Sequence, residues 1–195
     1  MRAVARAARL IVWDSHLEWS GRGCTAIETI PELVAACRTR EPAHLAYTGI
    51  TAPYWPPGRS AGKVDPFDGF CRVALAWGKL APCTVVVEEL AEVTSPNKAP
   101  PGWGELIRWA RKLGLSVYAI TQRPAETDKT ILGNAHRIVC HAMGRAEDEI
   151  YMARQLRVEQ KDVASLKRTR LEHIERLPDY TTRRGFTPRP KSRPV

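Results

Sequence analysis

The sequence has 195 residues, of which 44% are hydrophobic, and its 30 Lys and Arg against 21 Asp and Glu give a net charge of +9. A chain of this length buries roughly 70% of its unfolded surface, so folding requires neither disulfides nor a structural metal. The apolar runs are far shorter than the roughly 20 residues of a membrane span, and the N-terminus lacks a signal-peptide core. These features predict a cytoplasmic protein with no stable membrane insertion.

Apolar segments of strand length alternate along the chain with segments of helix length. Strands are predicted at residues 9–14, 44–48, 84–88, 115–121 and 137–142, and helices at residues 30–39, 67–80, 103–113, 127–134 and 145–156. This alternation is typical of an α/β fold in which a parallel sheet carries helices on both faces.

The proline-rich stretches 51–63 and 95–102 are predicted to be surface loops. Residues 171–187 fit a hairpin around Pro178 and Asp179, whereas a helix over 163–177 is the competing interpretation. After Pro188 we expect disorder. The predicted domains are therefore a core over residues 1–165 and a C-terminal extension over residues 166–195.

The positive charge is concentrated in that extension. Residues 166–195 contain nine Lys and Arg and three acids, a net charge of +6 out of the chain's +9. Such a segment is either the electrostatic footprint of a polyanion partner or a solvated end. The five cysteines are odd in number and have no metal-finger spacing, so we expect reduced core thiols.

Two carboxylates follow the apolar segment 84–87. Glu88 and Glu89 end a predicted buried strand, a position at which phosphoryl-transfer enzymes place a metal-side acid and a general base. On this interpretation Glu88 serves the metal and Glu89 polarises the attacking water. The alternative is that the strand ends there and its next turn is solvated.

A polar amide follows the next buried segment. Gln122 comes directly after residues 115–121, and ligands of parallel sheets sit at the carboxyl ends of the strands. Gln122 and Glu89 would therefore face one crevice if their strands are neighbours. A Gln can donate to a γ-phosphate oxygen and accept from the lytic water. Alternatively, Gln122 caps the following loop.

The segments 85–90, 114–124 and 132–139, together with Asp148, resemble the FtsK/HerA superfamily of P-loop ATPases that pump DNA. Within this superfamily, the sequence most resembles the genome-packaging ATPases of tailless, membrane-containing icosahedral viruses and their prophage relatives, both in its short length and in the segment 10–19, which resembles the family's second strand. The resemblance covers about residues 1–156. It implies a RecA-like sheet, ATP and Mg²⁺ as cofactors, and a homo-oligomeric ring, expected to be a hexamer, around double-stranded DNA. The resemblance further implies capsid or membrane-vertex proteins as partners and an association of the protein with the virion.

The sequence departs from this family at one point, because it contains no G-x-x-x-x-G-K-[ST] phosphate loop. The fragment 58–63 has the wrong glycine spacing and is followed by Val64, Asp65 and Pro66 rather than a helix. In the family the missing strand lies inside the sheet, beside the strand that precedes Gln122. Residues 1–8 would then be the last turns of the helix after the phosphate loop. Either the start codon lies within a longer reading frame, or the chain is a degenerate copy.

Two further residues are candidates for the nucleotide site. Asp14 follows the first predicted strand and could line the nucleotide crevice or bind nothing. A ring ATPase needs a cation that reaches the neighbour's γ-phosphate, and Arg111 is the first candidate, ahead of Arg108, Arg123 and Arg145. A basic residue in the last turn of a helix also compensates the helix dipole, so Arg111 has an ordinary structural explanation.

The sequence thus predicts an ATP-driven translocase of double-stranded DNA, of the viral or prophage packaging type. The same strands would serve a cellular HerA-like or conjugative translocase. A hypothesis of a different class is a non-hydrolysing DNA-binding or assembly protein derived from this family. An enzyme using Glu88 and Glu89 as an acid/base pair is disfavoured, because adjacent strand residues point to opposite faces.

Overall fold

The computed structural model describes residues 4–49 and 65–188, which belong to two units. The first unit holds the chain up to Thr121 together with Glu126–Ile131, and the second holds Gln122–Ala125 and the chain from Leu132 onward. The predicted loop 51–63, the fragment 58–63 and the segment after residue 188 lie outside the described residues. The predicted functional division at residue 165 stays a prediction.

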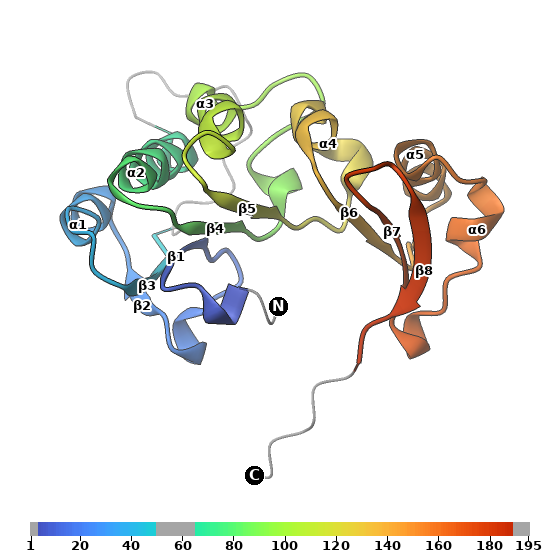
Figure 1. Ribbon diagram of the computed structural model, residues 1–195, viewed down its shortest axis with the longest axis horizontal. Coiled ribbons are helices and arrows are strands. Elements are labelled where there is room, and N and C mark those ends of the chain that lie inside the picture. The colour runs from blue at the N-terminus through green and yellow to red at the C-terminus, as the bar shows by residue number, and fades with distance from the viewer. Residues whose placement is uncertain (1–3, 50–64, 189–195) are drawn as a thin grey trace, which may run out of the picture. The chain divides into compact units, whose positions relative to one another are not determined.

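The first unit is built on a five-stranded parallel sheet with the order β2-β3-β1-β4-β5 (Figure 1). The strands are β1 (Arg9–Trp13), β2 (Thr25–Ile27), β3 (Ala43–Tyr47), β4 (Thr84–Val87) and β5 (Ser116–Ala119). The four strands predicted in this unit are present, whereas the edge strand β2 was not predicted. Parallel pairing brings the carboxyl ends of all five strands to one edge.

Three helices cover one face of this sheet: α1 (Ile30–Ala36), α2 (Pro66–Leu80) and α3 (Pro101–Ala110) (Figure 1). A capping box of Thr29 and Glu32 begins α1, and the Asp65 side chain accepts from the Phe67 N–H at the start of α2. Gly114 has a φ of +67°, which suits glycine and turns the chain after α3 into β5.

The residues between sheet and helices form the main hydrophobic core. Alternate strand residues point to this face, where Trp13 stacks on Tyr47 and contacts Phe67 and Phe70 edge-on. Trp77 and Trp103 are also fully buried here. Burying an aromatic side chain contributes about 1.5–3 kcal/mol, so this cluster fixes how the strand ends are placed.

The opposite face of the sheet is covered only in part. Leu10, Val12 and Val86 are buried there together with Val4, which lies in the short 3-10 helix Val4–Arg6. Residues in and directly after β5 are more open: Tyr118 is 39% exposed, and Ile120, which follows the strand, is 46% exposed. Within residues 4–49 and 65–188, β4 is the one strand that pairs with β5.

The second unit contains an antiparallel sheet in the order β6-β7-β8, with β6 (Ile138–His141), β7 (Glu172–Arg176) and β8 (Thr182–Phe186). Helices α5 (Ala146–Leu156) and α6 (Gln160–Ala164) pack on one face of it, while α4 (Lys129–Asn134) contains the boundary between the units. Strands β7 and β8 form the predicted hairpin, so the competing helix over 163–177 is wrong. The helix α6 was not predicted.

The cysteines behave as core residues. All five are buried and free, as predicted. Burial raises the pKa of the Cys37 thiol to about 12 and that of Cys83 to about 11, which keeps both protonated near neutral pH. In the parts of the chain that the structure describes, no helix combines the length and the apolar character needed to cross a membrane.

Candidate functional site

Polar residues follow three neighbouring strands at the carboxyl edge of the first unit's sheet. Asp14 follows β1, Glu88 and Glu89 follow β4, and Thr121 comes two residues after β5. The loops are joined by backbone hydrogen bonds, because the Glu88 N–H donates to Trp13 O at 3.3 Å and the Leu90 N–H to Ile120 O at 2.8 Å. In open α/β sheets this edge is where ligands bind.

Asp14 is fully buried and holds the loop that follows it. Its Oδ1 accepts from the N–H of Glu18 at 2.8 Å, its Oδ2 from that of Ser20 at 2.9 Å, and both oxygens lie 3.2 Å from the Trp19 nitrogen. Since three backbone donors surround this carboxylate, its described contacts are those of a loop anchor. Its predicted place in a nucleotide crevice stays a prediction.

Glu88 is 9% exposed and is held by the same loop. Its Oε1 accepts from the Trp19 indole Nε1–H at 2.7 Å, and its Oε2 from the His16 N–H at 3.3 Å. Burial raises the pKa of Glu88, and the negative charge of Asp14 raises it further. The hydrogen bonds from Trp19 and His16 lower this pKa, but by less. The net pKa therefore lies above its ordinary value of 4.5.

Replacing Trp19 by phenylalanine is expected to raise the pKa of Glu88 further, because the variant loses a donor to the ionised carboxylate. A carboxyl whose folded pKa lies above its unfolded pKa costs stability as the pH rises through that interval. The variant should therefore lose more stability at neutral pH than below pH 4.5. Carbon-13 NMR titration of the Glu88 carboxyl measures the shift, with Trp109→Phe as the control. A Glu88 midpoint that stays in place in the Trp19 variant would contradict the assignment.

Glu89 is linked to the neighbouring strand end. Its Oε1 accepts from the Thr121 hydroxyl at 2.6 Å and from the Ala91 N–H at 3.3 Å, and its side chain begins the short 3-10 helix Leu90–Glu92. The carboxylate is half-buried. Glu89, the acid predicted to polarise water, is therefore held in place by Thr121, which directly precedes Gln122.

Gln122 and Arg111 are both exposed. Gln122 is the first residue of the second unit, so its predicted place beside Glu89 stays a prediction. Arg111 is the C-cap of α3, at the end of this helix that leads into β5. Because that end lies at the amino edge of the sheet, Arg111 is not brought together with Glu88 and Glu89 within one chain. The alternative cations Arg108, Arg123 and Arg145 are exposed as well.

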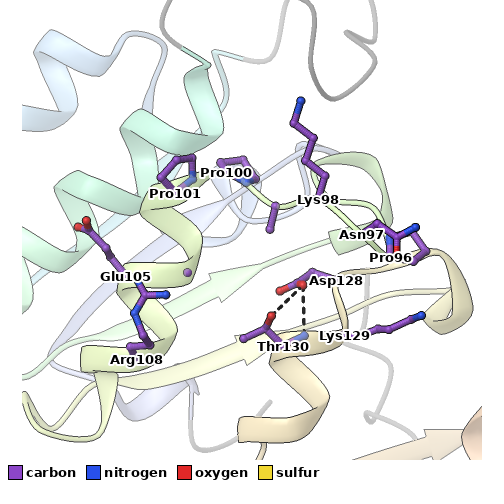
Figure 2. Close-up of a pocket in the computed structure, with 12 residues that line it drawn as sticks. Pro96, Asn97, Lys98, Pro100, Pro101, Glu105, Arg108, Asp128, Lys129 and Thr130 are labelled. Carbon is purple, nitrogen blue, oxygen red and sulfur yellow. Dashed lines mark hydrogen bonds between the residues drawn. The ribbon is translucent and has the colours of Figure 1, made fainter.

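A polar depression of about 410 Å³ lies at the start of α3, and sequence reasoning missed it (Figure 2). Lys98, Arg108 and Lys129 line it together with Asp128 and Thr130. Asp128 Oδ1 accepts from the N–H and the hydroxyl of Thr130 at 3.2 and 3.0 Å, as an N-cap of α4 does. The pattern Asp-x-Thr before a helix was the available sequence signal for this cap.

The site offers hard oxygen ligands. Among residues 4–49 and 65–188, no group of three His, Cys, Asp or Glu side chains is arranged to hold a metal ion. Mg²⁺ in phosphoryl-transfer sites commonly uses one or two carboxylates and takes its other ligands from phosphates and water. The buried carboxylate of Glu88 fits that requirement. Trp19 and His16, which hold it, were not predicted, since a contact across about 70 residues leaves no local pattern.

The parallel sheet, the covering helices and the acidic carboxyl edge define a P-loop NTPase-like α/β fold. The fold matches that of the genome-packaging NTPase B204 from Sulfolobus turreted icosahedral virus 2 in complex with AMPPCP, with a TM-score of 0.71 and 16% identity over 96% of this chain and 86% of that one. The DNA-packaging ATPase B204 from Sulfolobus turreted icosahedral virus matches with a TM-score of 0.61 and 16% identity, over 90% and 81% of the two chains.

The sequence is also similar to protein P9 of Pseudoalteromonas phage PM2. The two are 38% identical over 114 residues, which is 56% of this chain and 52% of P9. The matched region therefore spans about half the length of that relative. No protein-family model matches the sequence.

Proposed function

We propose that this protein is part of an ATP-driven translocase of double-stranded DNA of the viral genome-packaging type. The observation that carries the proposal is the acidic pair at the carboxyl edge, in which Glu88 is buried and Glu89 is bound by Thr121 from the next strand end. The likeness of fold to B204 and the sequence similarity to phage protein P9 support a packaging-related role.

Each residue then has a defined task. Glu88 would bind the Mg²⁺ ion of Mg-ATP, directly or through water, and Glu89 would orient and polarise the attacking water. Gln122 would contact the γ-phosphate and transmit its loss to the second unit. Arg111, placed at the opposite edge of the sheet, would act on the nucleotide of a neighbouring subunit. Asp14 would shape the crevice by holding the loop over residues 15–20.

The outer edge of β5 supports a further part of the proposal. In the described residues this edge has no paired strand, and the nearby Tyr118 and Ile120 are substantially exposed. Unpaired strand edges and exposed apolar side chains are features that folded proteins normally cover. We propose that a strand that carries a phosphate loop pairs here and that the helix after this strand covers Tyr118 and Ile120.

The proposed assembly is a homo-oligomeric ring, expected to be a hexamer, in the host cytoplasm or on the virion. Double-stranded DNA would pass through it, and capsid or membrane-vertex proteins would anchor it. The same chemistry would serve a HerA-like or conjugative translocase.

A second candidate is a non-hydrolysing DNA-binding or assembly protein of the same ancestry. One observation favours it: both oxygens of Glu88 already accept hydrogen bonds from Trp19 and His16, so the carboxylate is satisfied without a metal. A carboxylate oxygen has two lone pairs, and these bonds therefore also leave room for a metal-bound water.

Hydrolysis of ATP by the protein, expressed with any in-frame codons that precede Met1, tests the proposal. We expect Mg²⁺-dependent turnover of about 1–100 per second, the range typical of kinases, and stimulation by double-stranded DNA. Chelation of Mg²⁺ should abolish the turnover. An in-frame phosphate loop with no hydrolysis, with or without DNA, would favour the non-hydrolysing candidate.

A further inference from the structure

The sheet of the second unit packs one face on α5 and α6 (Figure 1), and its other face, the open face, carries exposed side chains such as Val139 and Arg183. On the packed face, Ile138, Cys140 and Ile174 contact residues of α5 and α6. Because strand residues alternate, the open face carries the intervening side chains. Two cross-strand rows result, the first Val139, Glu175 and Arg183, and the second His141, His173 and Gly185.

An acid with two arginines lies at the centre of the open face. Glu175 is fully buried although it belongs to this face, because the side chains of Arg137 and Arg183 lie over it. Arg137 Nε donates to Glu175 Oε2 at 2.7 Å, and Arg183 Nε donates to Oε1. Burial raises the pKa of Glu175, but the hydrogen bonds and charges of the two arginines outweigh this, so the pKa lies below its ordinary value.

The two arginines remain accessible to a ligand. Their side chains are 58% and 65% exposed. Among the contacts within residues 4–49 and 65–188, Arg183 uses only its Nε–H, on Glu175, which leaves both terminal nitrogens of its guanidinium for a ligand, and Arg137 keeps one such nitrogen. Two positive charges against one carboxylate leave the centre of this face positive. Arginines fixed in this way lose little entropy when they bind phosphate oxygens.

The surroundings of the pair favour a polyanion. The other acids of β7 and the hairpin turn are already occupied, since Glu172 pairs with Arg184 at 2.8 Å and Asp179 accepts from Thr181. His141 and His173 lie in the neighbouring cross-strand row of this face, and the centroids of their two rings are 5.3 Å apart.

We infer that the open face of β6-β7-β8 binds the phosphate backbone of double-stranded DNA, with Arg137 and Arg183 as its central contacts. This inference rests on the proposed function for the identity of the polyanion. The outward positions of the three strands hold no Phe, Tyr or Trp, and their two aromatic rings, those of His141 and His173, contact each other edge-on instead of forming an open stacking platform. A duplex, whose phosphates lie outside, therefore fits this face better than a single strand.

The test measures duplex binding by fluorescence anisotropy between about 50 and 200 mM salt, using this chain and a short duplex of mixed sequence. The variants are Arg137→Gln/Arg183→Gln and the same pair combined with Glu175→Gln. The triple variant leaves no buried charge without a partner, so it guards against a folding defect. The control is Arg38→Gln/Arg40→Gln, two exposed arginines of the first unit that change the net charge as much as the double variant does.

Both Arg137/Arg183 variants should bind at least about 10-fold more weakly at about 100 mM salt, and the slope of log K against log salt should fall by about 2. The control should stay within about 2-fold, because Arg38 and Arg40 belong to the first unit and are not part of the proposed face. The triple variant changes the net charge less than the control does, so a greater loss in the triple variant excludes a net-charge effect.

Equal binding by the wild type and the triple variant would overturn the inference, as would a wild type that does not bind the duplex. Binding to phosphatidylglycerol vesicles, but not to the duplex, with the same dependence on the arginines would also overturn it in favour of a membrane surface. ATP hydrolysis is measured separately. If the protein hydrolyses ATP but the arginine substitutions do not weaken DNA binding, the proposed DNA-binding face is wrong and the proposed ATPase function stands. If the substitutions weaken DNA binding but the protein does not hydrolyse ATP, the DNA-binding face stands and the proposed ATPase function is wrong.

Discussion

Replacement of Glu89 by glutamine is expected to reduce ATP turnover by about 100- to 10,000-fold, the range typical for loss of a general base. Glutamine keeps the size of the side chain and can still accept from Thr121, so the loop after β4 should keep its structure. It cannot take the proton of the attacking water. Nucleotide affinity should therefore change by less than about 3-fold, because the base acts in the transition state rather than in binding.

Glu92→Gln is the matched control for this variant, since Glu92 lies three residues away in the same 3-10 turn and is exposed. Steady-state hydrolysis and equilibrium binding of a labelled ATP analogue separate kcat from affinity. Turnover in Glu89→Gln equal to that of the wild type would remove Glu89 from the role of base. An equal loss in both variants would point to a structural effect of the turn.

Replacement of Asp14 by asparagine is expected to lower the free energy of unfolding by about 2–4 kcal/mol. The carboxylate is fully buried and accepts from three backbone N–H groups, and an asparagine amide would turn an N–H₂ group toward at least one of these donors. Because Trp19 is held by both Asp14 and Glu88, the loop over residues 15–20 should also become more mobile.

Urea denaturation and amide hydrogen exchange of residues 18–20 measure these two effects. Glu18→Gln makes the same chemical change in the same loop, at a side chain that is 52% exposed and, within the described residues, forms an ion pair only with Arg22. This control should cost less than about 0.5 kcal/mol. If Asp14→Asn matched this control, the anchor role assigned to Asp14 would be wrong.

The parallel sheet could be predicted because its strands carry strong local signals. Segments such as 84–87 are short, apolar and rich in valine, and every residue of β4 is in fact buried. Strand β2 escaped prediction because it has three residues, lies at the sheet edge and is mainly exposed. Its strand structure depends on pairing with β3, which no local pattern reports.

The C-terminal hairpin also depends on contacts that the local sequence does not report. Residues 163–177 are compatible with a helix as well as a strand, and distant contacts decide between them. Glu175 accepts from Arg137, which directly precedes β6, and from Arg183 of β8, and both strands are neighbours of β7. The turn is closed by bonds between Leu177 and Thr181 and between Tyr180 and Leu177. Composition within the segment contains none of this information.

The candidate site was predictable in its residue types but not in its contacts. Acids after β4 and an amide after β5 follow from the strand pattern and the topology rule for parallel sheets. That Trp19 binds Glu88 and that Thr121 binds Glu89 depends on how two loops fold against each other. The arrangement of Asp14 as a loop anchor likewise becomes visible only with the backbone of residues 18–20 in place.

The structure of the assembled protein with Mg²⁺ and a non-hydrolysable ATP analogue tests the central claim most directly. The account predicts the triphosphate at the carboxyl edge of β4 and β5, with Glu88 in the ligand shell of the magnesium ion and both Glu89 and Gln122 beside the γ-phosphate. A nucleotide bound elsewhere, or a strand on the outer edge of β5 that brings no phosphate loop to this edge, would contradict it.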